Sequence, residues 1–364
     1  MITYLFPVFY SYLFALSTFF KKELKFSLSI LVCCTVVIVS GLRYFSDTDY
    51  PAYYDIFVSL PKLQNLSASD IQNTYGEVGY LYLNVIVKSL GFEFFVVTIV
   101  SAFISIFGKF FFVKKLCYST PLVLTCYLAM HFVTTEFSEL RWSVATGFSF
   151  MAFCCFYYRK YYSVAFFFSL AVLFHYSTLL LFPIVFIKRI PIKYIFIIFT
   201  FSFILALSYK FFAFSISLDL NSSFYALARL QRYLNDPDSN VGFISLGKLV
   251  FYMSILFAMD KVSRGRNYDE ISVFLYKVAL CVASIGLCLS IAPVFFLRLA
   301  PVFDLVFLSL IFREIALLKI KSNRLFFSFI VIFLFSLWQL IALPRSLSVP
   351  LEHGGLGQYQ SVVF

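Results

Sequence analysis

Continuous apolar runs, separated by short polar segments, make up most of the chain. A helix needs about 20 apolar residues to cross a bilayer, whereas a barrel strand would alternate apolar and polar positions. The runs therefore predict an all-α, polytopic membrane protein with about twelve transmembrane helices. The predicted spans are 3–20, 26–42, 94–113, 120–133, 142–158, 161–174, 177–187, 194–216, 243–259, 271–293, 301–312 and 325–343.

One apolar segment, 77–90, does not fit this scheme. It is only about two-thirds as long as a normal span, and counting it as a crossing would reverse the side of every later loop. We interpret it as a short re-entrant or interfacial helix on the outer side. The alternative is a true crossing, with a later segment wrongly assigned as a span.

Cationic clusters recur between the runs, at residues 21–25, 114–115, 159–160, 188–189, 261–266 and 319–324. Cytoplasmic loops are enriched in Lys and Arg, and all these clusters are cytoplasmic if both termini lie outside. Residues 1–364 are then expected to form a single integral membrane domain. Its longest outer loops, 43–75 and 217–242, form the expected active-site face, because functional residues concentrate on loops.

Composition agrees with this class of protein. Hydrophobic residues make up 62% of the chain and charged residues 13%, against roughly 25% charged in soluble domains. The net charge of +11 lies mostly in short loops between apolar runs, so it indicates membrane orientation and not nucleic-acid binding. The eight cysteines lie in or beside apolar runs without CxxC spacing, which indicates packing and not a metal site or disulfide framework.

On this topology several arginines, but almost no lysines, face away from the cytoplasm. The outer arginines are Arg43, Arg141, Arg229, Arg232, Arg298 and Arg345, and Lys62 is the only lysine clearly in an outer loop. A planar guanidinium binds phosphate oxygens in pairs and stays charged when partly desolvated. The pattern indicates a site for a lipid-linked diphosphate at the outer leaflet.

Candidate acidic groups lie near two outer boundaries. Asp47 and Asp49 accompany Arg43 and several tyrosines in segment 41–55, where carboxylates could accept from sugar hydroxyls and rings could stack on sugars. The alternatives are an ordinary polar loop with an aromatic belt, or a divalent metal at the Asp-x-Asp pair, which nucleotide-sugar transferases use in the cytoplasm. Glu77 begins the short helix, either as an N-terminal cap or as a base or acceptor-sugar ligand.

Two other outer positions combine a polar side chain with an apolar setting. Arg141 opens a predicted span, where it either pairs with Glu136 or Glu139 or binds phosphate together with backbone N–H groups. His175 lies between two short apolar runs. It is either an ordinary hydrogen-bonded histidine or a group that binds diphosphate or transfers a proton.

The remaining arginines lie further along the chain. Arg229 and Arg232 are three residues apart and would share one face of a helix, as a phosphate clamp or as a solvated face. Arg298 is flanked by apolar sequence, where a charge is costly unless it is paired or functional. Asp304 is a candidate partner for it.

In this order along a multispan chain, these motifs resemble the EpsG-type family of polysaccharide polymerases, within the wider O-antigen polymerase (Wzy) class. The matching pieces are Arg43-Tyr44, Asp47-x-Asp49-Tyr50, Tyr53, Glu77-x-Gly79-Tyr80, Leu140-Arg141, Ala145, Phe174-His175-Tyr176-Ser177, Arg232-Tyr233, Arg298 and the tail from Gly357 to Phe364. The chain departs from the family pattern at Val78, where proline is frequent, and at Glu139, near a usual asparagine.

The resemblance implies a GT-C-like, metal-independent glycosyltransferase without a cofactor, in the bacterial inner membrane with its active face in the periplasm. It would transfer a glycan from undecaprenyl diphosphate onto an incoming lipid-linked repeat unit. Its partners would be that lipid-linked oligosaccharide, membrane lipid and a protein that regulates chain length. The expected diphosphate-binding residues are Arg43, Arg141, Arg232 and Arg298, and the expected catalytic residues are Asp47, Asp49, Glu77 and His175.

Two questions stay open at this point. Arg43 could bind phosphate or form an internal pair with Asp47. A lipid-linked oligosaccharide flippase, an O-antigen ligase or a membrane acyltransferase would share several of these features. A flippase should line a central cavity with charges at membrane depth, so the placement of charges on one side favours a one-sided transferase.

Overall fold

The computed structural model describes residues 2–15, 21–212, 250, 254–255, 269–290, 293–348 and 359–362. The described residues form helices and no strand, apart from one isolated bridge between Arg43 and Ser361. The predicted all-α class is confirmed. The chain divides into two compact units, unit 1 with residues Met1–Leu179 and Ile315–Phe364, and unit 2 with residues Leu180–Glu314.

Helices account for nearly all of the described part of unit 1. They are α1 (Ile2–Leu13), α2 (Lys22–Gly41), α3 (Asp49–Ser59), η2 (Leu63–Asn65), α4 (Ala68–Asn73), α5 (Val78–Ser89), α6 (Phe94–Leu116), α7 (Thr120–His131), η3 (Phe132–Ser138), α8 (Leu140–Tyr157), α9 (Tyr161–Phe174) and α15 (Lys321–Ser348). Unit 2 contains α10 (Ile192–Phe212) and α13 (Glu270–Cys288). Two elements pass from one unit to the other along the chain, η4 (Tyr176–Phe186) and α14 (Pro293–Leu317).

Several of these helices are long and apolar enough to cross a membrane. In the described part of the chain there are four, Lys22–Gly41, Phe94–Leu116, Glu270–Cys288 and Lys321–Ile341. The other predicted spans coincide with α1, α7, α8, α9, η4, α10 and α14 where they are described, and span 243–259 lies almost wholly outside the described residues. Two predictions differ in form: span 177–187 is a 3-10 helix, η4, and span 301–312 is the second half of a longer helix, α14.

The basic clusters of unit 1 gather at one end of its helices. Lys25, near the start of α2, donates from Nζ to the carbonyl of Tyr118, just after α6 (3.1 Å). Tyr158, at the end of α8, donates to the carbonyl of Lys115 (3.4 Å). At the other end of the α2–α6 pair, Thr98 Oγ1 donates to the carbonyl of Gly41 (2.5 Å). Arg43 therefore lies at the opposite end from the lysines at 21–25 and 114–115.

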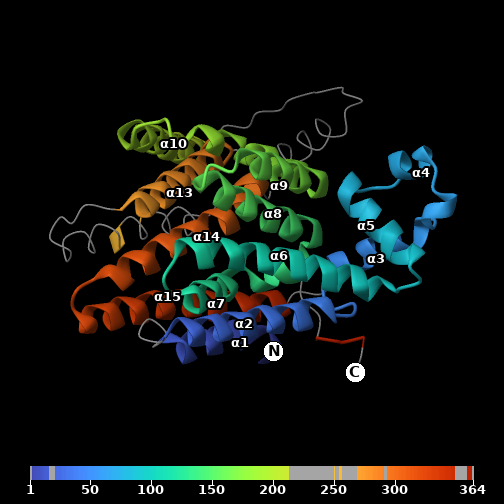
Figure 1. The fold of residues 1–364 in the computed structure, drawn as a ribbon, viewed down its shortest axis with the longest axis horizontal. Helices are drawn as coiled ribbons and strands as arrows, with labels where there is room; N and C mark the ends of the chain where they lie inside the picture. The colour runs from blue at the N-terminus through green and yellow to red at the C-terminus, as the bar shows by residue number, and fades with distance from the viewer. Residues whose placement is uncertain are drawn as a thin grey trace. The chain divides into compact units, whose positions relative to one another are not determined.

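The predicted outer loop 43–75 contains most of a small helical lobe. Figure 1 shows α3, α4 and α5 gathered beyond the Phe94 end of α6. Lys88 of α5 ties the lobe together, because its Nζ donates to the carbonyls of Phe57 (3.0 Å) and Leu60 (2.5 Å) at the end of α3. A cation is favourable at a helix C-terminus. The 12 residues of α5 extend about 18 Å, which agrees with an interfacial or re-entrant helix.

Unit 2 is built around the packing of α10 against α13. Asp269 caps α13 by accepting from the backbone N–H of Ser272 (2.9 Å), and it forms an ion pair with Arg313 of α14. Partial burial raises the pKa of Asp269, but hydrogen bonds from Arg313 and Ser272 outweigh this and lower it to about 2. The start of α13 is therefore fixed by a charged contact at neutral pH.

Candidate functional site

The first element of the candidate site is a buried ion pair directly after α2. Arg43 Nε lies 2.7 Å from Asp47 Oδ2, and the two side chains are 0% and 1% exposed. Arg43 Nη1 donates to the carbonyl of Ser40 (2.8 Å), and the rings of Phe137 and Tyr50 lie 5.1 and 5.8 Å from its Cζ. Of the two sequence-based alternatives for Arg43, the structure shows the internal pair with Asp47.

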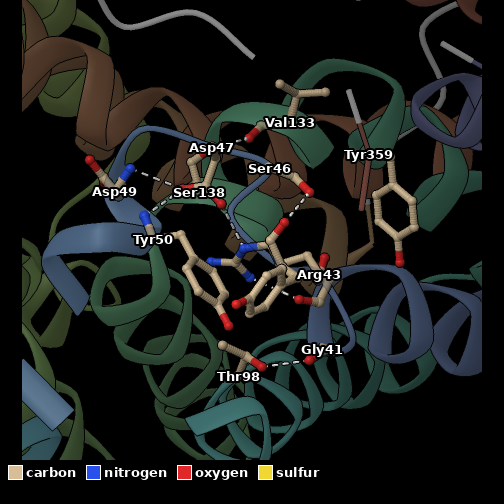
Figure 2. A network of polar contacts seen from close by, with 12 residues as sticks. Gly41, Arg43, Ser46, Asp47, Asp49, Tyr50, Thr98, Val133, Ser138 and Tyr359 are labelled. Carbon is tan, nitrogen blue, oxygen red and sulfur yellow. Dashed lines mark hydrogen bonds and ion pairs between the residues drawn. The ribbon is translucent and has the colours of Figure 1, made fainter. Parts of the chain in front are cut away.

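Asp47 also fixes the start of α3. Its Oδ1 accepts from the backbone N–H groups of Asp49 (3.0 Å) and Tyr50 (3.1 Å). Figure 2 shows the guanidinium of Arg43 directed toward Asp47, with the Tyr50 ring beside it. Burial raises the pKa of Tyr50 to about 12, so its phenol is protonated at neutral pH. Asp49 is half-buried in the first turn of α3.

Residues from near the end of the chain bind the loop that follows α2. Tyr44 N donates to the carbonyl of Gln360 (2.9 Å), and Val362 N donates to the carbonyl of Leu42 (3.0 Å). Gln360 N also donates to Ser46 Oγ (2.9 Å). The described part of the tail motif, residues 359–362, therefore contributes to the site by holding residues 42–46 in place.

The second element is another buried pair, between α8 and the start of α5. Arg141 Nη1 lies 2.5 Å from Glu77 Oε2, and the residues are 7% and 2% exposed. The rings of Tyr75 and Tyr53 lie 4.9 and 5.7 Å from Arg141 Cζ. Glu77 stands at the N-cap of α5, but its side chain makes no capping hydrogen bond. Glu77 therefore stands at the predicted N-terminal position of the helix, and its carboxylate pairs with Arg141 instead of bonding to the helix N–H groups.

Helix α3 connects the two pairs. Tyr50 and Tyr53, three residues apart on one face of the helix, contact Arg43 and Arg141 respectively. Tyr53 packs in turn against Tyr80 of α5, with ring centroids 5.4 Å apart. The result is an aromatic layer that holds two cationic side chains and their carboxylates at one end of unit 1.

His175 lies next to the Arg141 pair. It is 5% exposed, its ring meets Trp142 edge-on with centroids 5.1 Å apart, and its Nδ1 accepts from the backbone N–H of Ser177 (3.2 Å). This contact assigns the proton of the neutral ring to Nε2. Gly79 allows α5 to approach the end of α9 closely, because a Cβ on Gly79 would lie 2.9 Å from the carbonyl oxygen of Leu173.

A third charged cluster was not predicted. Lys109 of α6 and Glu136 of η3 are fully buried and lie 2.8 Å apart (Nζ to Oε1). From the sequence, Glu136 was expected only as a partner for Arg141, but the carboxylate that contacts Arg141 is Glu77. A lysine inside an apolar run was the available signal, since intramembrane charges are rare and functional by default.

The other arginines expected to bind diphosphate are not among the described residues of unit 1. Arg298, expected in the outer stretch around it, lies in the second turn of α14, in unit 2, and is half-buried. Asp304, its candidate partner, is fully buried in the same helix. Arg232 and Arg229 lie outside the described residues, and so does loop 217–242.

Comparison with known proteins decides the family. The family model described as "EpsG family" matches residues 26–360, nearly the whole chain. The chain belongs to the EpsG family. No curated protein and no solved structure matches it.

Membership of the EpsG family indicates a membrane protein with a polysaccharide polymerase type of function, associated with glycosyltransferase-like chemistry. In this EpsG-family chain, the residues of the predicted site that share unit 1 are Arg43, Asp47, Asp49, Glu77, Arg141 and His175. Among the described residues, no group of three or more His, Cys, Asp or Glu side chains is arranged to hold a metal ion.

Proposed function

We propose that this EpsG-family protein is a lipid-linked glycan polymerase. It transfers a glycan from undecaprenyl diphosphate to the end of an incoming lipid-linked repeat unit, at the periplasmic face of the bacterial inner membrane. The polymer is an O-antigen or a related polysaccharide. The reaction breaks the bond between the sugar and the diphosphate and forms a glycosidic bond to a hydroxyl of the acceptor.

One observation carries this proposal. Two buried arginine–carboxylate pairs lie at the end of unit 1 opposite its basic clusters, and each guanidinium keeps a buried N–H group without an acceptor among the described residues, Arg43 Nη2 and Arg141 Nε. Trp142 Nε1, on the residue after Arg141 and with its ring against His175, is a third buried donor without a partner among the described residues. Buried donors normally have partners. Several unsatisfied donors on cationic groups therefore support an anionic ligand such as a diphosphate.

The roles follow from charge development in the reaction. Negative charge grows on the diphosphate as it leaves, and preorganised cationic donors stabilise it. Arg141 binds the diphosphate, and the Nε2–H of His175 is a further donor. From the sequence alone, Arg232 and Arg298 are also expected to bind diphosphate. Arg43 is paired with Asp47, and only its Nη2 group is assigned to the diphosphate.

The acceptor hydroxyl needs a hydrogen-bond acceptor or base within reach. The carboxylates proposed for this step are Asp49 and Glu77. Asp49 is half-buried at the start of α3. Glu77 contacts Arg141 through Oε2 in the described contacts. Asp47 already accepts from Arg43 and two backbone N–H groups, so its part is to hold the other groups in place.

The test is the glycan ladder of cells that lack this gene, complemented with wild type, Arg298→Ala or Arg141→Ala. We expect core plus a single repeat in the deletion strain, with a full ladder restored by wild type alone. Lys160→Ala, an exposed cation at the basic end, is the control and should restore the ladder. Bare core in the deletion strain would indicate a flippase or ligase instead. Full ladders from both arginine variants would overturn the diphosphate assignment.

A further inference from the structure

The buried Lys109–Glu136 pair has a complete set of polar partners. Ser105 Oγ donates to Glu136 Oε2 (2.6 Å), and the hydroxyl of Tyr127 donates to Glu136 Oε1 (2.8 Å). Lys109 Nζ donates to Ser105 Oγ (2.6 Å) and to the carbonyl of Ser143 (3.3 Å). Helices α6, α7 and α8 and the π-helix η3 therefore converge on this one ion pair.

Stability alone does not account for such a pair. Burying two charges costs several kcal/mol per ion before their attraction is counted, and apolar replacements of similar size are often neutral or stabilising. Lys109 lies within α6, one of the helices apolar and long enough to span the membrane. Charges at such positions usually have a function.

The segment that carries Glu136 reaches both arginines of the candidate site. Glu136 lies in η3, and π-helical turns are rare and frequent at functional sites. The next residue, Phe137, places its ring 5.1 Å from Arg43 Cζ and edge-on to Tyr4 (5.3 Å). Arg141 follows in the first turn of α8. A shift of Glu136 would therefore move the contacts of Arg43 and Arg141 together.

Lys109 fixes the other side of this arrangement. Its neighbour Gly108 faces Gly147 of α8 so closely that a Cβ on Gly108 would lie 2.3 Å from the carbonyl oxygen of Gly147. The backbones of α6 and α8 are thus in contact, and the Lys109 bond to Ser143 adds a polar link one turn away. Together they set the position of α8, and with it Arg141, relative to α6.

We infer that Lys109 and Glu136 form a positioning pair, which holds η3 and the start of α8 so that Arg43 and Arg141 keep their places at the site. The inference rests on the proposed function. Neither residue touches substrate. Both act by fixing the positions of Phe137, which contacts Arg43, and of Arg141. The pair is retained for geometry and not for its contribution to the free energy of unfolding.

The decisive variant removes both charges at once, Lys109→Met with Glu136→Gln. It leaves no unpaired buried charge, so we expect it to accumulate in the membrane and to melt in detergent close to the wild-type temperature. Long polymer should nevertheless fall at least about tenfold, since displacement of catalytic groups by about 1 Å lowers rates steeply. Lys109→Arg keeps the charge pair and should restore part of the ladder.

Lys114→Met is the matched control, because Lys114 is an exposed cation on the same helix; it should give a wild-type ladder. A double variant with wild-type melting and a wild-type ladder would overturn the positioning role. So would a double variant that fails to accumulate, since the pair would then be needed for folding. If wild type itself failed to restore a ladder, the proposed function would fail and not the positioning role alone.

Discussion

Arg141 keeps a full charge in a nearly water-free place because Glu77 lies against it. The two residues are 64 positions apart, and their contact is 2.5 Å. Arginine does not lose its proton in proteins, so the guanidinium cannot adapt by becoming neutral. Glu77 is thus required for the fold of this end of unit 1 whatever further part it has in the reaction.

Replacing Glu77 with Gln removes the counter-charge and keeps the shape. Breaking a buried pair by removing one partner costs about 3–5 kcal/mol, and we expect a corresponding drop in the melting temperature of the detergent-purified protein. Asp55→Asn is the control, because Asp55 is exposed on α3 and such changes stay within about 0.5 kcal/mol. Equal melting temperatures for the two variants would contradict a stabilising role for the Glu77–Arg141 pair.

Single residues of the site were easier to predict than their partners. Arg141 and Glu77 stood out because each is a charge beside an apolar run. Their pairing did not, since a glutamate at a helix N-terminus is locally favoured by the helix dipole. Glu136 is close to Arg141 in sequence, but it lies in the π-helix η3 and pairs with Lys109. Sequence distance is a poor guide where the helical period changes.

At the scale of elements, helix α6 meets α8 through two glycines. Gly108 and Gly147 allow backbone contact, which is the way membrane helices pack most closely. A methyl group on Gly108 would have to push against backbone, which cannot move aside as a side chain can. The separation of α6 and α8 therefore depends on this one place.

We expect Gly108→Ala to separate the helices and to lower the free energy of unfolding by at least about 1–3 kcal/mol, the range for overpacking. The measurement is the melting temperature of the purified protein, with polymer length as a second readout. Gly286→Ala on α13 is a matched control: its Cβ would meet the Phe296 ring at 3.3 Å, and a side chain can adjust. A Gly108→Ala protein that melts no lower than Gly286→Ala would refute this account.

The elements themselves followed well from apolar patterning, and the exceptions have physical causes. Runs such as 26–42 and 94–113 are helices because nothing in them breaks the apolar pattern. Segment 177–187 is equally apolar but forms a 3-10 helix that contains Pro183, and proline removes a helical hydrogen bond. Helix α14 begins at Pro293 and continues through Pro301, so it includes Arg298, which the sequence prediction left outside span 301–312.

For the whole molecule, the separation of arginines from lysines is the feature that links fold to function. In unit 1, Lys25 and Lys115 lie at one end of α2 and α6. The lobe of α3, α4 and α5 lies at the other end (Figure 1). The Arg43 and Arg141 pairs lie at this end too, because their carboxylates, Asp47 and Glu77, lie just before α3 and α5. By the positive-inside rule the lysine end is cytoplasmic. The proposed reaction requires the lobe to be periplasmic.

Cysteine labelling tests this orientation directly. In a background without the eight native cysteines, Asp55→Cys on α3 and Lys160→Cys after α8 place exposed thiols at opposite ends of unit 1. In intact spheroplasts, a membrane-impermeant maleimide should label Asp55→Cys at once and Lys160→Cys only after permeabilisation. The reverse pattern would put the buried arginine pairs on the cytoplasmic side and would remove the basis for the proposed polymerase.

The same assay decides whether α5 crosses the membrane. Glu93 is exposed between α5 and α6, so Glu93→Cys should be labelled from the same side as Asp55→Cys if α5 is interfacial or re-entrant. Labelling from opposite sides would make α5 a true crossing. The 12 residues of α5 reach about 18 Å against a hydrocarbon core of about 30 Å. Lys88 near its end also binds the carbonyls of α3, and both facts favour labelling from the same side.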